Sequence, residues 1–245
     1  MNILGVIPAR YASQRFPGKP LAMIGERSMV RRVYEAAKAC SVLNKVVVAT
    51  ESDVIAEHVR EFGGLVELTS DQHPSGTDRV AEVAAQHPES DVIVNIQGDQ
   101  PFVTAMMLEQ LVEPYLAGQC PEMTTLACPF HEDGDVQDPN AVKVICDRNQ
   151  NALYFSRAPI PYYRQVGPAP VFHHLGLYAF RRDFLERYAS LEPTPLEQCE
   201  ALEQLRVLEH GYTITVCHTE TAVLEVNTPA DLEAAQRLVF LGEDL

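Results

Sequence analysis

The sequence lacks the features typical of zinc-binding, disulfide-rich, membrane-spanning and secreted proteins. None of its six cysteines forms a C-x-x-C pair, so neither a zinc cage nor a disulfide scaffold is expected, and the thiols should be reduced and mostly buried. Its apolar runs are of strand length, far below the roughly 18 residues of a membrane span, so no membrane insertion is expected. No basic segment precedes the first apolar stretch and no small-residue cleavage site follows it, which favours a cytoplasmic protein.

Positive charge is scarce as well. The chain has 19 Lys and Arg against 34 Asp and Glu, with a formal net charge of -15 at pH 7. Most of such a surface repels a polyanion, so nucleic acid is not an expected partner. A small anionic substrate could still bind where the cations are concentrated, and Arg10, Arg15 and Lys19 are close together near the N-terminus. The spacing of a Walker A loop is absent, so ATPase chemistry of that class is not indicated.

What the sequence does contain is a regular alternation of strand and helix patterns in its first half. Its 245 residues, 46% of them hydrophobic, are enough for a sizeable core. Strands are predicted at 3–8, 45–50, 65–69 and 91–96, and helices at 28–40, 53–62 and 78–86. Continuous Val and Ile runs imply a parallel sheet covered on both faces. We therefore predict a doubly wound, mainly parallel α/β fold with ligands at the carboxyl ends of its strands.

The second half is less regular. Strands are predicted at 123–129, 141–146, 175–180 and 213–218, helices at 182–190 and 195–210, and a proline-rich irregular excursion at 158–164. A last helix should begin with Thr228 as N-cap, Pro229 at N1 and Asp231 at N3. We predict one domain, 1–245, with a core at about 1–120 and 212–245 and an inserted smaller subregion at about 121–211.

The loop that follows the first strand is the strongest candidate for a binding site. Residues 6–20 place Arg10, Arg15 and Lys19, together with Ser13, on a loop rich in Pro and Gly. Backbone N–H groups and cations of such a loop suit a polyphosphate. Most Arg and Lys side chains are merely solvated surface charges. The concentration of cations at a strand end in so acidic a protein favours a phosphate site.

Residues 75–79, Ser-Gly-Thr-Asp-Arg, indicate a loop followed by a helix start. Gly76 permits close backbone approach, and the free N–H groups could contact a pyrimidine edge or a phosphate. The same residues, with Thr77 and Asp78, could equally form a simple helix cap. The pattern alone leaves both interpretations open.

Asp99 ends an apolar strand, directly after a glycine. A carboxylate there can hold Mg²⁺ against a triphosphate, since Mg²⁺ takes oxygen ligands and one or two protein carboxylates. The alternative is a plain turn, because Gly-Asp followed by Gln-Pro is good turn chemistry. Its position at a strand end favours the metal.

Seven blocks in order along the chain resemble the 3-deoxy-manno-octulosonate cytidylyltransferase (CMP-Kdo synthetase) family. The blocks are 6–20, 75–79, 95–99, 153–161, 174–178, 202–206 and 228–232. The resemblance covers essentially the whole chain. It implies a nucleotide-diphospho-sugar transferase-like fold, Mg²⁺ as cofactor and a homodimer. It also implies the reaction of CTP with Kdo to give CMP-Kdo and pyrophosphate, for lipopolysaccharide synthesis.

The resemblance also implies roles for individual residues. The nucleotide would be held by Pro8, Ala9, Arg10, Ser13, Arg15, Lys19, Ser75, Gly76 and Arg79. The sugar acid would be held by Gln97, Arg157, His174, Tyr178, Glu203 and Gln204. The metal would bind at Asp99 and Asn227, and the catalytic residues would be Lys19, Arg10 and Asp99. The core would bind the nucleotide, and the inserted subregion would bind the sugar and form the dimer.

The sugar residues have a chemical rationale and also simpler interpretations. An arginine fork suits the carboxylate of the acid, and Gln, Glu, His and Tyr suit its hydroxyls. Taken singly, His174 could be a satisfied core histidine and Tyr178 an ordinary strand side chain. Glu203 could form an i,i+3 surface pair with Arg206.

Two positions depart from the family pattern, and both lie beside the expected metal. Gly98-Asp-Gln-Pro101 replaces Gly-Asp-Glu-Pro, and Val226-Asn-Thr-Pro229 replaces Val-Asp-Thr-Pro. Asn227 can offer a neutral carbonyl oxygen but no charge, so weaker Mg²⁺ binding is expected, and an Asn227→Asp substitution should strengthen it. Asn227 could instead be no ligand and only stabilise a turn.

The expected mechanism is direct in-line attack by the sugar's C2 hydroxyl on the α-phosphorus of CTP, without a covalent enzyme intermediate. Lys19, Arg10 and Arg15 would neutralise the phosphates, and Mg²⁺ on Asp99 would bridge the α-phosphate and the sugar carboxylate. Three alternatives remain open. They are transfer to 8-amino-3,8-dideoxy-manno-octulosonate, a catalytically weakened CTP-binding homologue, and a transferase for another acid such as neuraminate or for a neutral sugar.

Overall fold

The computed structural model describes most of the chain and divides it into two compact units. The described residues are 1–12, 16–73, 75–130, 135–165, 169–220 and 222–241. Unit 1 comprises Met1–Glu109 and Val223–Leu245, and unit 2 comprises Gln110–Ala222. The predicted division of one domain at about 120 and 212, with separate roles for its parts, stays a prediction.

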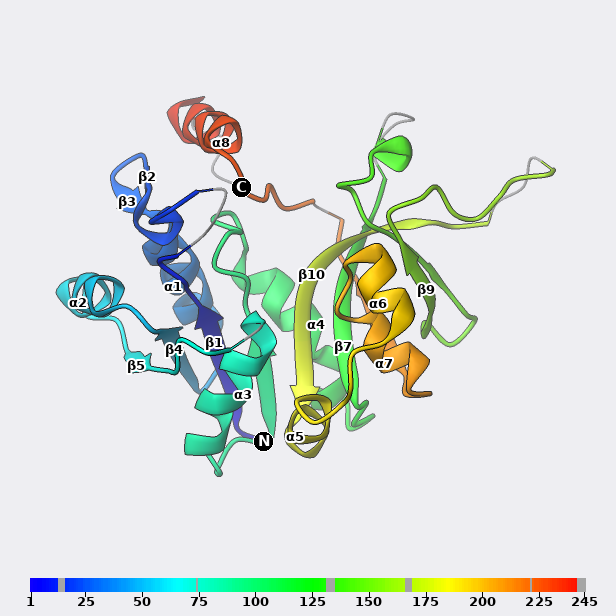
Figure 1. The fold of residues 1–245 in the computed structure, drawn as a ribbon, viewed down its shortest axis with the longest axis horizontal. Helices are drawn as coiled ribbons and strands as arrows, with labels where there is room; N and C mark the ends of the chain where they lie inside the picture. The colour runs from blue at the N-terminus through cyan, green and yellow to red at the C-terminus, as the bar shows by residue number, and fades with distance from the viewer. Residues whose placement is uncertain (13–15, 74, 131–134, 166–168, 221, 242–245) are drawn as a thin grey trace. The chain divides into compact units, whose positions relative to one another are not determined.

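Unit 1 is built on the parallel strands β1 (Ile3–Pro8), β4 (Lys45–Thr50), β5 (Val66–Leu68) and β6 (Val92–Asn95), of which β1, β4 and β5 are labelled in Figure 1. β1 pairs with β4 on one side and with β6 on the other, and β4 pairs with β5. The side chains of β4 and β6 are almost all buried, as continuous Val and Ile runs require. The predicted mainly parallel α/β class is confirmed.

Three helices connect these strands and cover the sheet. α1 (Met29–Ala39) packs on β4, α2 (Asp53–Glu61) on β5 and α3 (Gly76–Gln86) on β1. The connections through α1 and α2 run in one direction along the sheet, and the connection through α3 runs back. Right-handed crossovers therefore place α3 on the face opposite α1 and α2, which is the doubly wound arrangement.

Helix α4 (Ala105–Leu116) was not predicted from the sequence. It begins in unit 1 and ends in unit 2. Its buried face includes Leu108, Leu111 and Val112, but other apolar residues lie around the helix and Pro114 stands inside it. The 3.6-residue periodicity of a helix can be recognised in a sequence only when one face of the helix is polar. In this segment apolar residues lie on all sides and a proline interrupts the pattern, so the helix could not be recognised.

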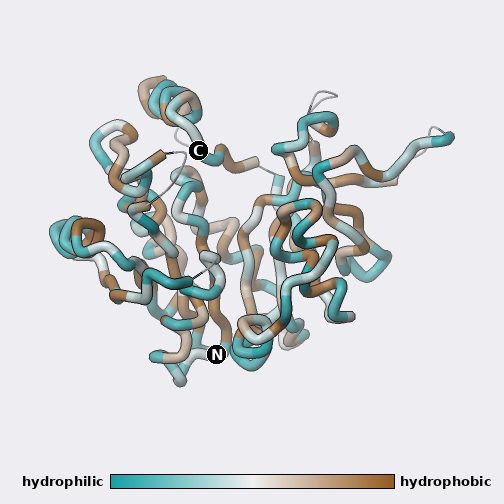
Figure 2. The backbone as a smooth tube through the Cα atoms, in the orientation of Figure 1, coloured by the Kyte–Doolittle hydropathy of each residue, from teal (hydrophilic) through white to brown (hydrophobic). Residues whose placement is uncertain are grey.

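Unit 2 has a mixed sheet. β7 (Met123–Pro129) pairs antiparallel with β10 (Phe172–Arg181) and parallel with β11 (Ile214–His218). β8 (Lys143–Cys146) joins β10 to β9 (Ala152–Ser156), a strand that the sequence did not predict. In both units the strands are largely hydrophobic (Figure 2).

The helices of unit 2 are shorter than predicted. α5 spans Arg182–Tyr188, and the single helix predicted at 195–210 is two helices, α6 (Pro195–Glu200) and α7 (Leu205–Glu209). α6 ends because Ala201 adopts a left-handed conformation with φ 51°, which an α-helix cannot continue. The segment 158–164 contains neither helix nor strand, as its prolines predicted. A short 3₁₀ turn, η2 (Asp135–Gln137), precedes β8.

The chain returns to unit 1 at Val223 and ends there with its last helix, α8 (Pro229–Leu241). The predicted start is confirmed: the Asp231 amide donates to Thr228 Oγ1 at 3.3 Å, and the Thr228 amide donates to Asp231 Oδ2 at 2.8 Å. A buried cluster that includes Phe102, Val226 and Ala235 packs this segment against the first residues of unit 1. That region also holds η1 (Lys19–Leu21) and the hairpin of β2 (Met23–Ile24) and β3 (Arg27–Ser28).

Two composition-based expectations can be compared with the structure. All six cysteines are unpaired, but only Cys40 and Cys128 are buried, while Cys120 and Cys199 are exposed, so the expectation of mostly buried thiols is wrong. Among the described residues, no helix combines the length and the apolar character that crossing a membrane requires.

Candidate functional site

The loop after β1 is held at both of its described ends. The Ala9 amide donates to the Ala49 carbonyl at 2.9 Å, so the chain still follows β4 just beyond Pro8. The Tyr11 amide donates to Glu51 Oε1 at 2.9 Å. Further along, the Gly18 amide donates to the Tyr11 carbonyl at 3.0 Å and closes the loop. The predicted residues Ser13 and Arg15 lie outside the described residues.

Gly18 sets the position of Lys19. Its φ of 69° is left-handed, a conformation that favours glycine, and it precedes the 3₁₀ turn η1. The turn places the Lys19 ammonium 2.9 Å from Asp99 Oδ2, although the two residues are 80 positions apart in the sequence. Their side chains are 17% and 26% exposed, so the ion pair is only partly shielded from water.

Asp99 reaches this place because the loop after β6 lies directly on the end of β1. A Cβ at Gly98 would stand 2.8 Å from the Pro8 carbonyl oxygen, closer than real Cβ atoms come, so only glycine permits this approach. β1 and β6 are parallel neighbours, and their carboxyl ends therefore meet at one edge of the sheet. The strand-end reasoning that singled out Lys19 and Asp99 is confirmed in its geometry. The predicted sugar residue Gln97 belongs to the same loop.

The returning segment brings Asn227 to the same place. The Val226 amide donates to the Asp99 carbonyl at 2.9 Å, which aligns the two chain segments. Asn227 Oδ1 lies 3.4 Å from Lys19 Nζ and accepts a hydrogen bond from it. Lys19, Asp99 and Asn227, all predicted from the sequence, therefore form one group in unit 1.

Glu225 belongs to this group and was not predicted. It accepts hydrogen bonds from Gln100 Nε2 at 3.3 Å and from Asn227 Nδ2 at 3.2 Å. Partial burial among the surrounding protein atoms, and then the charge of Asp99, raise the pKa of its carboxyl, although the side chain reaches solvent. Its spacing of two residues from Asn227 was the available signal, since residues i and i+2 share one side of an extended chain.

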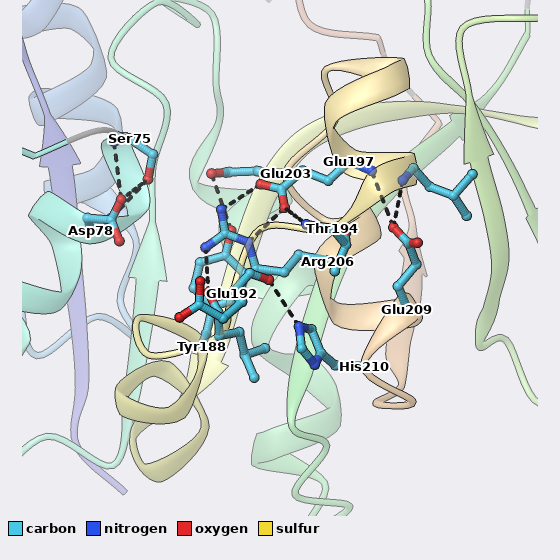
Figure 3. A network of polar contacts seen from close by, with 12 residues as sticks. Ser75, Asp78, Tyr188, Glu192, Thr194, Glu197, Glu203, Arg206, Glu209 and His210 are labelled. Carbon is cyan, nitrogen blue, oxygen red and sulfur yellow. Dashed lines mark hydrogen bonds and ion pairs between the residues drawn. The ribbon is translucent and has the colours of Figure 1, made fainter.

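Arg79 and Ser75 are both engaged within the protein. The Arg79 side chain is 1% exposed, lies 3.0 Å from Glu51 Oε2 and donates to the Thr69 hydroxyl. Burial lowers the pKa of its guanidinium, Glu51 opposes that shift, and the nearby charge of Arg10 adds to it. The Ser75 hydroxyl accepts from the Asp78 amide at 3.2 Å and donates to its Oδ2 at 2.7 Å, a helix cap visible in Figure 3.

The capping interpretation of residues 75–79 is therefore confirmed for Asp78, but the capping residue is Ser75 and Thr77 lies inside the helix. It leaves the predicted contact with a nucleotide open, because a capped helix start still presents backbone N–H groups. Gly76 lies against the Pro8 ring, 3.5 Å from where its Cβ would be, so this helix start is beside the end of β1. The roles predicted for Ser75, Gly76 and Arg79 stay predictions.

Three of the predicted sugar residues form a buried hydrogen-bonded chain in unit 2. Thr125 Oγ1 donates to the Leu177 carbonyl at 2.8 Å, so its contact of 2.9 Å with His174 requires the imidazole Nε2–H to donate. His174 Nδ1 then accepts from Gln204 Nε2 at 3.4 Å, and Gln204 Oε1 accepts from the Tyr178 hydroxyl at 3.1 Å. The direction of each hydrogen bond from Thr125 to Tyr178 is thereby assigned.

His174 is a satisfied core histidine in this structure. Its side chain is buried, and burial followed by the charge of His173 lowers its pKa to about 3. The imidazole is therefore neutral at physiological pH. A role of His174 toward a sugar stays a prediction, and the geometry allows it to act by orienting Gln204.

Arg157 and Glu203 lie near the break between α6 and α7. Arg157 Nε donates to the Glu200 carbonyl at 2.8 Å and Nη2 donates to the Ala201 carbonyl at 3.4 Å, so its guanidinium binds the carboxyl end of α6. Glu203 Oε2 accepts from the Tyr188 hydroxyl at 3.5 Å.

Arg206 forms its bidentate ion pair with Glu197, at 2.6 and 2.8 Å (Figure 3). This pair ties α7 to α6 across the break. The predicted contacts of Arg157 and Glu203 with a sugar stay predictions.

The donor set of unit 1 fits a hard divalent cation that is shared with a ligand. Within the described part of the chain, no three His, Cys, Asp or Glu side chains gather into a complete metal site. Asp99 offers a carboxylate and Asn227 a carbonyl oxygen. Mg²⁺ is typically held by one or two protein carboxylates while the substrate's phosphates and water complete the shell.

Known proteins match the chain over nearly its whole length. A family model described as cytidylyltransferase matches residues 4–214. The 3-deoxy-manno-octulosonate cytidylyltransferase of Acaryochloris marina is 64% identical over 242 residues, which cover 99% of this chain and 99% of that one.

Solved structures match the fold. A CMP:2-keto-3-deoxy-manno-octonic acid synthetase complexed with CTP superposes with a TM-score of 0.94 at 38% identity, covering 99% of this chain and 100% of that chain. A 4-diphosphocytidyl-2C-methyl-D-erythritol synthase from Anaerococcus prevotii has a TM-score of 0.64 at 14% identity, covering 98% of each chain, and so shares the fold alone. The fold expected from the sequence is thereby confirmed.

Proposed function

Because the chain belongs to the 3-deoxy-manno-octulosonate cytidylyltransferase family, we propose that unit 1 holds CTP and a divalent cation and that unit 2 holds the sugar acid. The chain is a cytidylyltransferase: it activates Kdo with CTP, giving CMP-Kdo and pyrophosphate for lipopolysaccharide synthesis. The division of labour between the units and the roles of single residues are the proposal.

The ion pair between Lys19 and Asp99 is the observation that carries the proposal. It puts an ammonium and a carboxylate 2.9 Å apart at the carboxyl end of two parallel strands, partly exposed. The two side chains are 17% and 26% exposed, so a ligand can reach the pair and replace one partner of each. Lys19 would turn to a phosphate, and Asp99 with Asn227 would hold Mg²⁺.

The nucleotide would be bound by residues of two segments of unit 1, the loop after β1 and the start of α3. Lys19, with Arg10 and Arg15, would neutralise the phosphates, and Pro8, Ala9 and Ser13 would line the loop. The capped start of α3, with Ser75, Gly76 and Arg79, would contact the base and the phosphates. Mg²⁺, when bound, supplies the positive charge that stabilises the triphosphate as it reacts.

Catalysis would then rest on position and charge. The C2 hydroxyl of the sugar would attack the α-phosphorus in line with the departing pyrophosphate, with no covalent enzyme intermediate. Lys19 and Arg10 would stabilise the charge that develops on the phosphate oxygens, since preorganised cations act without reorganisation during the reaction.

Binding of the sugar acid would use the polar side chains of unit 2, and the sugar-binding role proposed for Gln97, a residue of unit 1, is a separate proposal. The chain of hydrogen bonds from His174 fixes the Gln204 amide and the Tyr178 hydroxyl, so both are oriented before a ligand arrives. Arg157 would pair with the carboxylate and Glu203 with a hydroxyl. We further propose that unit 2 forms a homodimer and that the enzyme acts in the cytoplasm. Light scattering on the purified chain tests the dimer.

Pyrophosphate release tests the proposed residue roles. The wild-type enzyme should release pyrophosphate from CTP and Kdo only with Mg²⁺, and a Lys19→Met variant should lose at least about a hundredfold in kcat/KM. Lys38→Met, the same change at an exposed position of α1, is the control and should retain full activity. A Lys19→Met enzyme as active as this control would refute the assigned role.

Substrate choice is tested by a screen of nucleotides against sugar acids. The screen should include 8-amino-3,8-dideoxy-manno-octulosonate, neuraminate and a neutral sugar. Turnover with CTP and Kdo alone is expected. CTP binding without turnover of any acid would instead indicate a weakened binding homologue.

A further inference from the structure

Glu225 is placed between the two positions at which the sequence departs from its family. Its Oε1 accepts from Gln100 Nε2 at 3.3 Å and its Oε2 accepts from Asn227 Nδ2 at 3.2 Å. The Glu225 carboxylate therefore accepts a hydrogen bond from each amide, and it uses a different oxygen for each. The Gln100 side chain is 1% exposed, whereas Glu225 reaches solvent, so the carboxylate is accessible from outside and anchored from within.

These contacts explain why amides stand at positions 100 and 227. A glutamate at 100 or an aspartate at 227 would bring a second carboxylate against Glu225, and like charges at hydrogen-bond distance repel strongly. An amide of similar shape donates a hydrogen bond instead. Gln100, Asn227 and Glu225 thus form one arrangement, in which a single carboxylate accepts from two amide donors.

Glu225 also fixes which way the Asn227 amide points. Because the NH₂ group donates to Glu225, the carbonyl oxygen faces Lys19 Nζ at 3.4 Å, and Lys19 in turn contacts Asp99. The reversed amide would set NH₂ against an ammonium and C=O against a carboxylate, which is unfavourable at both ends. Asn227 therefore presents its only metal-binding atom to the group that contains Asp99.

We propose that Glu225 is the acidic partner of Asp99 at the cation site: it supplies the negative charge that Asn227 lacks and holds the Asn227 carbonyl oxygen toward Lys19 and Asp99. It is a positioning residue that acts through Asn227 and through its charge. The inference rests on the proposed function, because it assumes that a divalent cation binds beside Asp99.

Binding of Mn²⁺ tests the proposal without turnover. Free Mn²⁺ is measured by electron paramagnetic resonance in a titration of the enzyme with CTP and no sugar. Glu225→Gln should weaken Mn²⁺ binding about tenfold, as expected when one charge is removed near a divalent cation. Glu61→Gln, which removes an exposed charge from α2, should bind as the wild type does.

A double-mutant cycle separates the proposed role from a structural one. Returning the carboxylate to position 227, in Glu225→Gln with Asn227→Asp, should bring Mn²⁺ affinity back to within about threefold of the wild type. Asn227→Asp should gain less in the wild-type background, because its carboxylate then meets Glu225. Equal gains in both backgrounds would overturn the coupling. Melting of the metal-free variants verifies that each one is folded.

The outcomes distinguish this inference from the function on which it rests. If the wild type binds Mn²⁺ in the presence of CTP and Glu225→Gln binds it equally well, the inference is wrong and the proposed cation site stands. If the wild type binds no Mn²⁺ with CTP, the cation site itself is refuted and the inference with it.

Discussion

The polar groups of the two units are built in opposite ways. In unit 1, Lys19, Asp99 and Glu225 are charged, and the contact between Lys19 and Asp99 is one that a ligand can replace. In unit 2, the chain from His174 through Gln204 to Tyr178 is neutral and buried, and all its hydrogen bonds are made inside the protein. Charged, exchangeable groups suit a metal and a triphosphate. Neutral, fixed groups suit the hydroxyls of a sugar.

The difference is also one of energetics. The charged groups of the Lys19–Asp99 pair are reachable from solvent, so a ligand that brings its own charges can take over their contacts. A buried polar group that loses its partner costs about 1–3 kcal/mol, so unit 2 holds its geometry whether or not a ligand is bound. Substitutions in unit 1 should therefore alter mainly catalysis and cation binding, and those in unit 2 mainly sugar affinity and stability.

Asp99→Asn should have the largest effect. The substitution keeps the shape of the side chain but removes the carboxylate that we assign to the cation, so kcat/KM for CMP transfer should fall by about a thousandfold or more. Asp91→Asn, at an exposed position before β6, is the matched control and should be nearly silent. An Asp99→Asn enzyme within about tenfold of the wild type would remove the basis for treating unit 1 as the reactive half.

Gly98→Ala should have the second largest effect, because it disrupts the close contact between the loop after β6 and the end of β1. The new Cβ would stand 2.8 Å from the Pro8 carbonyl oxygen, so the loop must shift, at a cost of about 1–3 kcal/mol in the free energy of unfolding. Thermal melting measures this. Gly76→Ala, whose Cβ would meet Pro8 at an ordinary 3.5 Å, should leave stability nearly unchanged. Equal melting of both variants would contradict the explanation given for Gly98.

Tyr178→Phe tests whether the polar side chains of unit 2 affect the binding of the sugar acid and not that of CTP. It removes the hydroxyl that donates to Gln204 Oε1 at 3.1 Å. The Gln204 amide is then held less firmly, so the KM for Kdo should rise about tenfold while the KM for CTP stays constant. Steady-state kinetics with each substrate varied in turn provides the measurement. A rise in the KM for CTP instead would show that the two units do not divide the substrates.

The sequence indicated where the polar group of unit 1 forms, for a physical reason, while the roles of its residues stay predictions. Parallel strands bring their carboxyl ends to one edge, so the loops that follow β1 and β6 lie there, and Lys19 and Asp99 from these loops are in contact. Glu225 could not be found in this way. Glu225 is brought near Asp99 by the hydrogen bond between Val226 and Asp99. This pairing joins segments that are far apart in the sequence, and apart from the spacing of Glu225 from Asn227 no local pattern predicts it.

Unit 2 was harder to predict because its elements depend on tertiary packing. The break between α6 and α7 arises at Ala201, a good helix former held in a left-handed conformation. Among the strands that the structure describes, β9 pairs with β8 at the edge of the sheet, and this pairing is set by register and not by the composition of β9. The satisfied state of His174 likewise required Thr125 and Gln204, whose positions the sequence leaves unspecified.

The response to pH should show the smallest effect and the clearest contrast between the units. Burial holds the pKa of His174 near 3, below the ordinary value of about 6.5, so between these values the unfolded chain binds the extra proton. Stability from this group is therefore complete above about pH 6.5 and declines as the pH falls. At pH 5.5 the loss should be about 1 kcal/mol relative to pH 7.

Denaturant unfolding at a series of pH values, in the wild type and in His174→Asn, measures this term. The wild type should lose about 1 kcal/mol more than the variant between pH 7 and pH 5.5, since the contribution of His218, whose pKa burial also lowers, is common to both and cancels. Parallel curves for the two proteins would mean that His174 is not kept neutral by its surroundings. The hydrogen-bond directions assigned from it to Tyr178 would then be wrong.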